Sequence, residues 1–386
     1  MKTPPFAIDK TRYIERLEHS SERAVFFSRP HGFGKSRFVD TLSTYYDRNA
    51  ADRFHTAFAG TYIADHKTPL VNQFFVLRFS FRSLGTETAF YRSVRESLHD
   101  FFRRYPHSRE TEILQRPYCC AASLIERFFA VLGQDFQDRL FIIIDEYDPW
   151  DNTVFSAAAA APAEALPDTG FLTDFFLKIK TALGGFGPVS RLFVCGSSLI
   201  SPFSLTDGYF PAVDLSALPE YAGLFGLMEP ELRYLIQMQI PTASHADHEQ
   251  LLKKLKSLCG GYRFSPYAEE TMLNTAQSLA FLNGAPTENP ALQDTLTTLF
   301  RLSYRNDVRD LIRCVRERQP MDFGGDVLGL LSLSDLPRLH RDELLTALFS
   351  LGYVTTVPDE EFALTAPNDT AADALQKACE ATGLYR

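Results

Sequence analysis

The stretch that decides the fold is residues 24–36, AVFFSRPHGFGKS. Its first five residues form a short apolar run with the length and the β-forming content of a buried strand. After Ser36, apolar residues recur at helical spacing, at Phe38, Val39, Leu42, Tyr45 and Tyr46. The order is therefore strand, glycine-containing loop and helix, which is the context that a phosphate-binding loop requires.

The residues of this loop match that chemistry. Backbone N–H groups turn inward around phosphates in such a loop, and the following helix presents its positive end. Lys35 is predicted to reach the β- and γ-phosphates, and the Ser36 hydroxyl is predicted to ligate Mg²⁺. The pattern GxxxxGK[ST] has glycine where this chain has Arg29, and an ordinary turn before a helix is the alternative. The predicted nucleotide-binding residues here are Arg29, Pro30, His31, Gly32, Phe33, Gly34, Lys35, Ser36 and Arg37.

A carboxylate pair follows a second strand pattern. Residues 140–144 are continuously apolar and lead into Asp145 and Glu146. A strand that is apolar on both faces belongs inside a sheet covered by helices on both sides. Asp145 is predicted to hold Mg²⁺, and Glu146 to polarise the attacking water. The alternative is that both are solvated carboxylates at the end of a strand. If they do form a site, a glutamate beside the magnesium-binding aspartate favours ATP hydrolysis over kinase-type phosphate transfer.

Two further residues are candidates for the same site. Ser197 follows the apolar run 191–195, and we predict that it senses the γ-phosphate if that strand lies beside the carboxylate strand. A simple turn is its alternative. Arg263, in the segment GYRF, is predicted to reach the phosphates as a charge-stabilising arginine. A surface arginine after a glycine helix stop is equally compatible with the pattern.

The rest of the chain divides into three parts. Apolar runs alternate with amphipathic helical patterns up to about Leu227, which predicts a largely parallel α/β sheet flanked by helices. Residues 156–170 are rich in alanine and proline and are predicted to form a surface loop. Helical patterns dominate beyond Leu227. Close to the end, Asp342 is predicted to cap a helix that stops at Gly352, and a hairpin turns at residues 358–361. We expect a P-loop ATPase core (1–227), a helical extension (228–320) and a winged-helix-like module (321–386).

Composition narrows the class of protein. The 386 residues carry a formal net charge of −9, which excludes a uniformly basic nucleic-acid coat but permits a local basic groove. Four arginines at i, i+4 spacing are predicted to share one helical face, and acidic neighbours favour a solvated, salt-bridged face over a nucleic-acid site; they are Arg301, Arg305, Arg309 and Arg313. We expect a cytoplasmic protein that is not in the membrane, because no secretory signal or membrane span is readable and the six cysteines lack CxxC spacing.

Six ordered motifs resemble those of the bacterial AAA-ATPase-like family. Residues 9–14 are similar to its opening DKTxxI, residues 29–36 to RPRRFGKS, and residues 145–149 to DEYDxP. Residues 224–229, 261–264 and 352–355 are similar to its LFGFTEEE, NGYRF and GYLT motifs. The resemblance implies a P-loop NTPase of the ASCE/AAA-like type, with a helical extension and a winged-helix-like end. The implied ligand is ATP with Mg²⁺.

The chain departs from the family pattern in two places. His31 and Gly32 stand where the family has two arginines, which removes positive charge near the phosphates. Members often carry a C-terminal PD-(D/E)XK nuclease-like domain, whereas only a short tail follows Pro367 and Asn368 in this sequence. We therefore expect no nucleic-acid cleavage by that route.

Together these observations predict an ATP-binding switch protein that hydrolyses ATP. The alternative is a scaffold or binding module whose P-loop core is structural, and which contacts protein or DNA through its winged-helix end.

Overall fold

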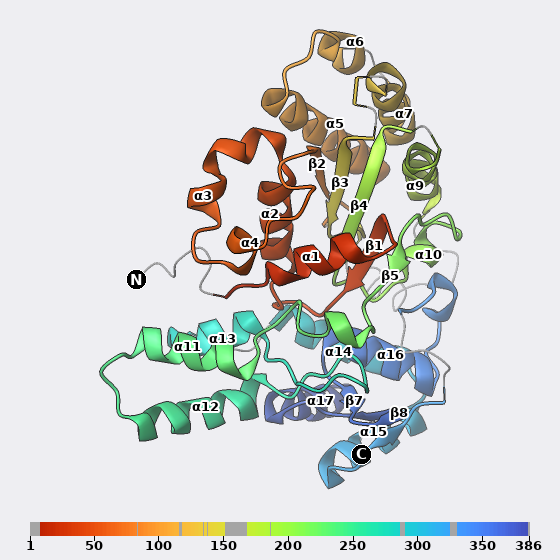
Figure 1. Ribbon diagram of the computed structural model, residues 1–386. Coiled ribbons are helices and arrows are strands. Elements are labelled where there is room, and N and C mark those ends of the chain that lie inside the picture. Colours follow the sequence, from red (N-terminus) through yellow and green to blue (C-terminus); the bar gives the residue numbers. More distant parts are fainter. Residues whose placement is uncertain are drawn as a thin grey trace.

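The computed structural model describes residues 8–82, 84–115, 118–133, 135–136, 138–150, 168–185, 187–285, 290–324 and 330–384. The loop predicted at residues 156–170 lies outside the described residues, except for its last three. The chain forms an upper part built on a parallel sheet and a lower part of helices with a small second sheet (Figure 1).

The parallel sheet has five strands in the order β2-β3-β4-β1-β5. They are β1 (Ala24–Ser28), β2 (Phe75–Ser80), β3 (Leu140–Asp145), β4 (Val189–Gly196) and β5 (Val213–Asp214). All six residues of β3 are buried, as expected of a strand with neighbours on both sides and helices on both faces. The parallel α/β fold is thus confirmed. Strand β4 lies between β1 and β3, which is the arrangement on which the prediction for Ser197 depends.

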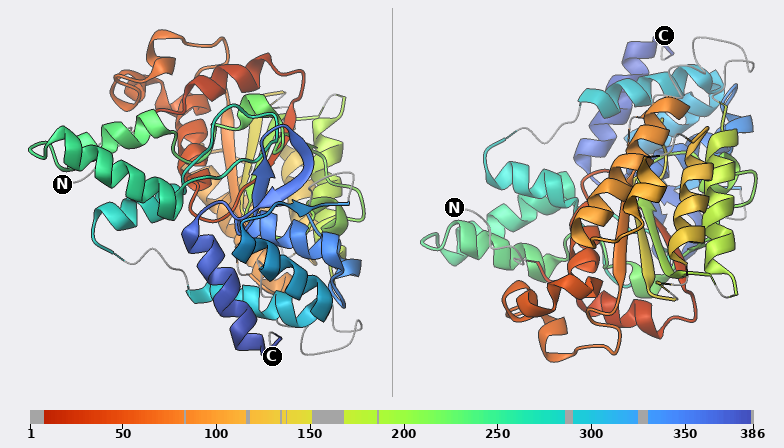
Figure 2. Two further views of the ribbon diagram at one scale, coloured as in Figure 1. Left: turned by 90° about the horizontal axis from the view of Figure 1, so that it is seen from below. Right: turned by 90° about the horizontal axis from the view of Figure 1, so that it is seen from above.

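Alternate residues of the strands feed two separate hydrophobic cores. Phe26, Ile142 and Ile144 pack with helices on one face of the sheet, whereas Phe27 and Ile143 belong to a cluster on the other face. The first face carries α5 (Glu87–Arg104), α6 (Glu110–Leu114), α7 (Ala121–Leu132) and α9 (Gly170–Leu183). The second carries α1 (Arg12–His19), α2 (Lys35–Tyr46), α3 (Phe54–Ala57) and α4 (Tyr62–Asp65), and Figure 2 shows these elements from below and from above. Helix α10 (Pro202–Leu205) follows β4.

The lower part begins with α11 (Glu229–Gln239), α12 (His245–Cys259) and α13 (Thr275–Leu282), which share a small apolar cluster. Four further helices follow: α14 (Pro290–Leu302), α15 (Arg305–Glu317), α16 (Arg341–Leu351) and α17 (Asp369–Thr382). An antiparallel sheet of order β6-β8-β7 accompanies them, made of β6 (Met321–Asp322), β7 (Thr355–Val357) and β8 (Glu360–Thr365).

Packing in the lower part favours a boundary other than residue 321. Helix α14 packs on α16 and α17, and α15 packs on α17. We therefore propose that the helical extension comprises α11 to α13, and that the C-terminal module begins with α14.

Two local predictions in this region are wrong. Arg301 lies on α14, whereas Arg305, Arg309 and Arg313 lie on α15, so the four arginines do not form one continuous helical ridge. The helical structure is interrupted at Ser303 and Tyr304, where Ser303 forms an isolated β-bridge with Leu339. Asp342 lies in the first turn of α16, and His340 occupies the cap position instead. Gly352 ends this helix as predicted, in the left-handed conformation at φ +82°.

Helix α16 precedes the hairpin, which is the place of the helix that enters the major groove in a winged-helix DNA-binding module. Most of its residues from Leu344 to Leu351 are buried inside this protein. The hairpin tip carries Asp359, Glu360 and Glu361, which repel phosphate. This geometry disfavours the alternative in which the winged-helix end binds DNA.

Candidate functional site

The loop of residues 29–34 leaves the carboxyl end of β1 and leads directly into α2, which begins at Lys35. Gly32 and Gly34 both adopt φ +88°, in the left-handed region that favours glycine. A Cβ atom on Gly32 would lie 2.5 Å from Asn274 Oδ1, so this glycine is also required by a close approach. The two glycines therefore fix the curvature of the loop.

The carbonyl groups of the loop point outward and are held there. Three successive carbonyls accept hydrogen bonds, two from the start of α13 in the lower part of the molecule and one from Gly226, which precedes α11. The bonds are Asn274 Nδ2 to His31 O at 2.9 Å, Ala276 N to Gly32 O at 2.9 Å and Gly226 N to Phe33 O at 2.8 Å. These three bonds fix the backbone orientation of the loop, and two of them come from the lower part of the molecule.

The N–H groups of the loop are the complement of this arrangement. Among the described residues, the backbone N–H groups of residues 32–36 meet no hydrogen-bond acceptor. Because backbone donors are nearly always satisfied by protein, water or ligand, a row of five such donors at a helix N-terminus is an anion-binding concavity.

Lys35 is buried, and its Nζ donates to the carbonyls of Arg29 (2.8 Å) and Pro30 (3.1 Å). Burial lowers the pKa of Lys35, while the nearby charges of Glu146 and Asp145 oppose this shift. The amine is therefore next to the carboxylates that end β3, in a place where a negative ligand compensates its desolvation.

Glu146 is held by contacts from two neighbouring strands. Its Oε1 accepts from Arg82 Nη2 at 2.8 Å, just beyond β2, and its Oε2 accepts from the Ser197 backbone N–H at 2.9 Å, just beyond β4. The Ser197 hydroxyl donates to the same carboxylate at 2.9 Å. Burial alone raises the pKa of Glu146, but Lys35, Arg82 and His31 outweigh it, and the pKa is lowered. Glu146 also adopts φ +55°, a costly conformation for glutamate that is typical of functional sites.

Asp145 is the last residue of β3 and is buried, with the Cys195 thiol donating to its Oδ1 at 3.5 Å. Ser198, beside Ser197, donates to Asp148 Oδ2 instead. The two serines thus serve different carboxylates, and only Ser197 contacts Glu146 among the bonds described here.

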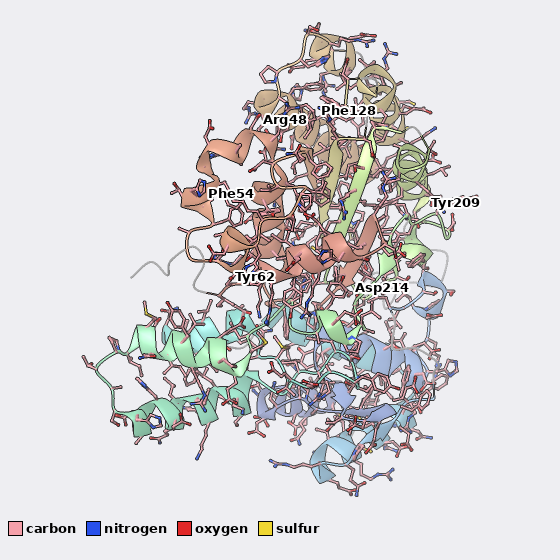
Figure 3. All side chains as sticks on the ribbon, viewed as in Figure 1. Arg48, Phe54, Tyr62, Phe128, Tyr209 and Asp214 are labelled. Atoms are coloured by element: carbon pink, nitrogen blue, oxygen red, sulfur yellow. The ribbon has the colours of Figure 1, made fainter. Side chains whose placement is uncertain are left out.

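The Arg29 side chain is buried. An arginine that contacts phosphate at the surface of a loop would instead point toward solvent. Arg29 is 2% exposed, and its guanidinium lies 4.3 Å above the Phe264 ring. Burial lowers the pKa of Arg29 to about 10, although Asp214 opposes the shift. Asp214 lies where the sheet meets the lower helices (Figure 3). Arg29 Nη1 donates to the Ser28 carbonyl at 2.9 Å, while Nε and Nη2 have no partner among the described residues.

Arg263 and Arg37, which were both predicted to belong to the site, lie in different surroundings. The backbone of Arg263 bonds to Thr355 of β7. Its neighbours Tyr262 and Phe264 pack edge-on against Phe33 of the loop, with centroids 5.0 and 5.2 Å away. Because alternate residues of an extended segment point in opposite directions, Arg263 faces away from the loop. Arg37 lines a small cavity of about 50 Å³ together with Lys10, Thr11 and Gly34.

Two residues that contact the candidate site were not predicted from the sequence. Arg82 follows β2 at the same sheet edge as Asp145 and Ser197, and that position was its available signal. Asn274 precedes α13 and looks like a helix cap, a role it has toward Gln277, but its contact with the His31 carbonyl has no sequence signal.

A comparison with known protein families identifies the family of the chain. The model of a family described as "Predicted AAA-ATPase" matches residues 5–207, more than half of the chain. The chain belongs to this predicted AAA-ATPase family. The resemblance drawn from the motifs is thus confirmed, and three of the six motifs lie beyond the matched residues. Membership of a predicted AAA-ATPase family implies nucleotide binding.

One solved structure is similar over most of the chain. It is Cdc6p from Pyrobaculum aerophilum, with 13% identity over 96% of this chain and 92% of that chain, at a TM-score of 0.29. This TM-score is too low to support an inference about the fold or the function of the chain. No curated protein matches the sequence. None of the helices in the described ranges combines the length and apolar character that crossing a membrane requires.

Proposed function

We propose that this protein binds ATP and hydrolyses it with Mg²⁺, and that nucleotide state is transmitted to the lower part of the molecule. The observation that carries the proposal is the row of backbone N–H groups at residues 32–36, which meet no acceptor among the described residues. A positive potential for a polyphosphate comes from these donors, from the N-terminal end of α2 and from the Lys35 amine.

Lys35 would exchange its present partners for the β- and γ-phosphates. The two carbonyls that hold its amine are neutral acceptors, whereas phosphate oxygens form charge-assisted bonds of roughly twice the strength. The triphosphate would then extend from His31 and Glu146 at its γ end toward Arg37. The small cavity beside Arg37 and Thr11 is where we place the nucleoside.

Ser36 and Asp145 would hold Mg²⁺. A hydroxyl and a carboxylate oxygen fit this hard cation, which is usually bound by one or two protein oxygens, phosphate oxygens and water. Asp145 is 8% exposed and has only a thiol donor among its described hydrogen bonds, so its oxygens are available to an ion. Bound Mg²⁺ would neutralise charge that develops on the phosphates.

Glu146 would orient and deprotonate the attacking water. Its carboxylate is ionised in its present surroundings and lies beside Ser197, which is suited to sensing the γ-phosphate. Arg82 holds the other carboxylate oxygen. We do not assign Arg263 a phosphate contact, because its aromatic neighbours are the residues that face the loop.

The lower part of the molecule would respond to the nucleotide through the loop carbonyls. Asn274 and Ala276, at the start of α13, hold two of them directly. Any rotation of a loop peptide toward phosphate therefore changes a bond to α13. This gives the switch a physical connection from the phosphates to the helical extension.

Calorimetric titration with ATP and Mg²⁺ tests the proposal. Lys35→Ala should abolish ATP binding, whereas Lys178→Ala, which removes a surface lysine paired with Glu126, should leave it unchanged. Glu146→Gln should bind ATP and release no phosphate. Equal ATP affinity of the wild type and Lys35→Ala would refute the assignment of the loop.

A further inference from the structure

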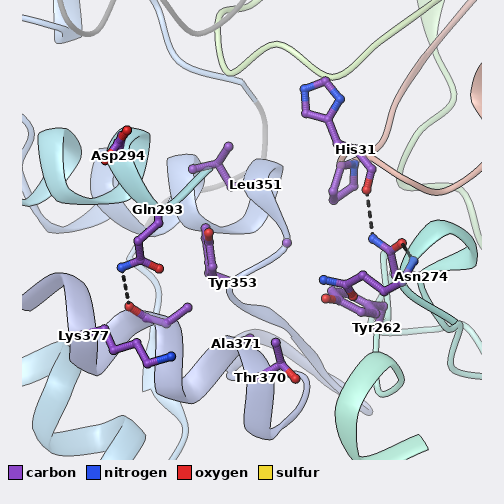
Figure 4. Close-up of a pocket in the computed structure, with 14 residues that line it drawn as sticks. His31, Tyr262, Asn274, Gln293, Asp294, Leu351, Tyr353, Thr370, Ala371 and Lys377 are labelled. Carbon is purple, nitrogen blue, oxygen red and sulfur yellow. Dashed lines mark hydrogen bonds between the residues drawn. The ribbon is translucent and has the colours of Figure 1, made fainter. Parts of the chain in front are cut away.

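His31 occupies the third position of the loop. Its ring lies against Ser197, the residue that donates a hydrogen bond to Glu146. The ring Nε2 lies 3.0 Å from Ser197 Oγ, and Nδ1 lies 3.2 Å from it. The His31 carbonyl is fixed separately, by Asn274. Figure 4 shows this bond, and shows the ring directed away from Asn274 and Tyr262. The position of the ring is therefore set by a backbone that the lower part of the molecule holds in place.

Ser197 joins His31 to Glu146. Its Oγ lies 2.9 Å from Glu146 Oε2 and 3.1 Å from Oε1, so either carboxylate oxygen is within reach of the hydroxyl. A hydroxyl is both a donor and an acceptor. The three side chains thus form an unbroken hydrogen-bonded chain from carboxylate to imidazole.

The chain runs from the interior toward solvent. Glu146 is 7% exposed and Ser197 is 1% exposed, whereas His31 is partly exposed. His31 also lines a cavity of about 300 Å³ between the loop, α14, α16 and α17 (Figure 4). A proton that reaches His31 can therefore pass to water.

We propose that His31 and Ser197 form a relay that carries the proton of the attacking water from Glu146 to solvent. The inference rests on the proposed function. As the water oxygen bonds to the γ-phosphorus and the bond to the ADP oxygen breaks, the water O–H proton moves to Glu146. Ser197 then accepts that proton at Oγ and gives its own to the lone pair of a ring nitrogen of His31. The imidazolium releases the proton to solvent, and all three residues return to their starting states.

The last group of the relay is the one that exchanges protons with solvent. Asp294 of α14 and Lys377 of α17 line the cavity beyond His31. Imidazole is the side chain best suited to accept and release a proton near neutral pH. Arginine, which the family motif has at this position, is always protonated and cannot accept one.

Steady-state hydrolysis by His31 variants, with chemical rescue by free imidazole, tests the relay. His31→Ala should lower kcat at least about tenfold with KM nearly unchanged, because the phosphate-binding N–H groups belong to the backbone. Millimolar imidazole should restore part of the lost kcat in His31→Ala. It should restore none in the double variant His31→Ala/Ser197→Ala, where the middle of the chain is missing. Imidazole should also leave the control His245→Ala, at an exposed site, unaffected.

His31→Arg separates a relay from a simple positive charge. The relay predicts that His31→Arg is as slow as His31→Ala, and wild-type kcat in His31→Arg would overturn it. Undiminished kcat in His31→Ala, or equal imidazole rescue with and without Ser197, would also overturn the relay while the proposed ATPase stands. ATP titration of each variant confirms that its loop is folded. No hydrolysis by the wild type would instead refute the proposed function itself, and the relay with it.

Discussion

Gly32→Ala tests whether the lower part of the molecule clamps the loop. Two separate costs are expected. The first is backbone strain, because alanine at φ +88° costs about 1–2 kcal/mol. The second is steric, because the new Cβ would lie 2.5 Å from Asn274 Oδ1 and 3.1 Å from Ala276 Cβ. Asn274 must then move, which weakens its bond to the His31 carbonyl and its cap of α13.

The magnitude of the steric cost follows from those two bonds. A lost neutral hydrogen bond is worth about 1 kcal/mol, and a lost helix cap is also worth about 1 kcal/mol. Gly32→Ala should therefore lower the free energy of unfolding by about 3–4 kcal/mol in total. The matched control is Gly60→Ala, at φ +76° with nothing within 4 Å of its Cβ, which should cost only the strain of about 1–2 kcal/mol.

Urea unfolding, followed by the fluorescence of Trp150, measures the difference. Trp150 is the single tryptophan of the chain and is buried. A double-mutant cycle gives a further check, because in an Asn274→Ala background the added cost of Gly32→Ala should fall to about 1–2 kcal/mol. Equal costs for Gly32→Ala and Gly60→Ala, or full additivity with Asn274→Ala, would refute the clamp.

Three further predictions follow from the charged groups. Burial raises the pKa of Glu146, but the cations beside it hold that pKa below its ordinary value of 4.5, so stability is lost as the pH falls through the lowered pKa. Glu146→Gln should therefore lose less unfolding free energy than the wild type between about pH 6 and about pH 3; an equal loss would contradict this sign. Arg29→Met should keep or raise the free energy of unfolding, because it retains packing on Phe264 and removes a buried charge without full hydrogen bonding, whereas a large loss of stability would show that the charge is compensated. In fluorescence anisotropy with duplex DNA, the wild type and the charge reversal Arg305→Glu should behave alike at low salt, and a binding signal that this reversal removes would restore the DNA alternative.

The sequence alone determined the elements of the core and the order of its chemistry. Strand β1, the loop and α2 are encoded locally, by an apolar run, two glycines and a helical repeat within residues 24–46. The fully apolar run before Asp145 likewise specifies a strand with neighbours on both sides. These signals are short-range, so they are readable without the fold.

Contacts between distant segments were decided only by the tertiary structure. Asn274 lies 243 residues from the His31 carbonyl it holds, and Arg82 lies 64 residues from Glu146. Tyr262 and Phe264 face the loop because their segment packs against Phe33, and Arg263 between them therefore faces away from the loop. The sequence does not show where this segment packs. The burial of α16 is also a property of packing, since its sequence does not say which surfaces cover it. Local patterns identify the groups that do chemistry, but hydrogen bonds between segments far apart in the chain decide which of those groups meet.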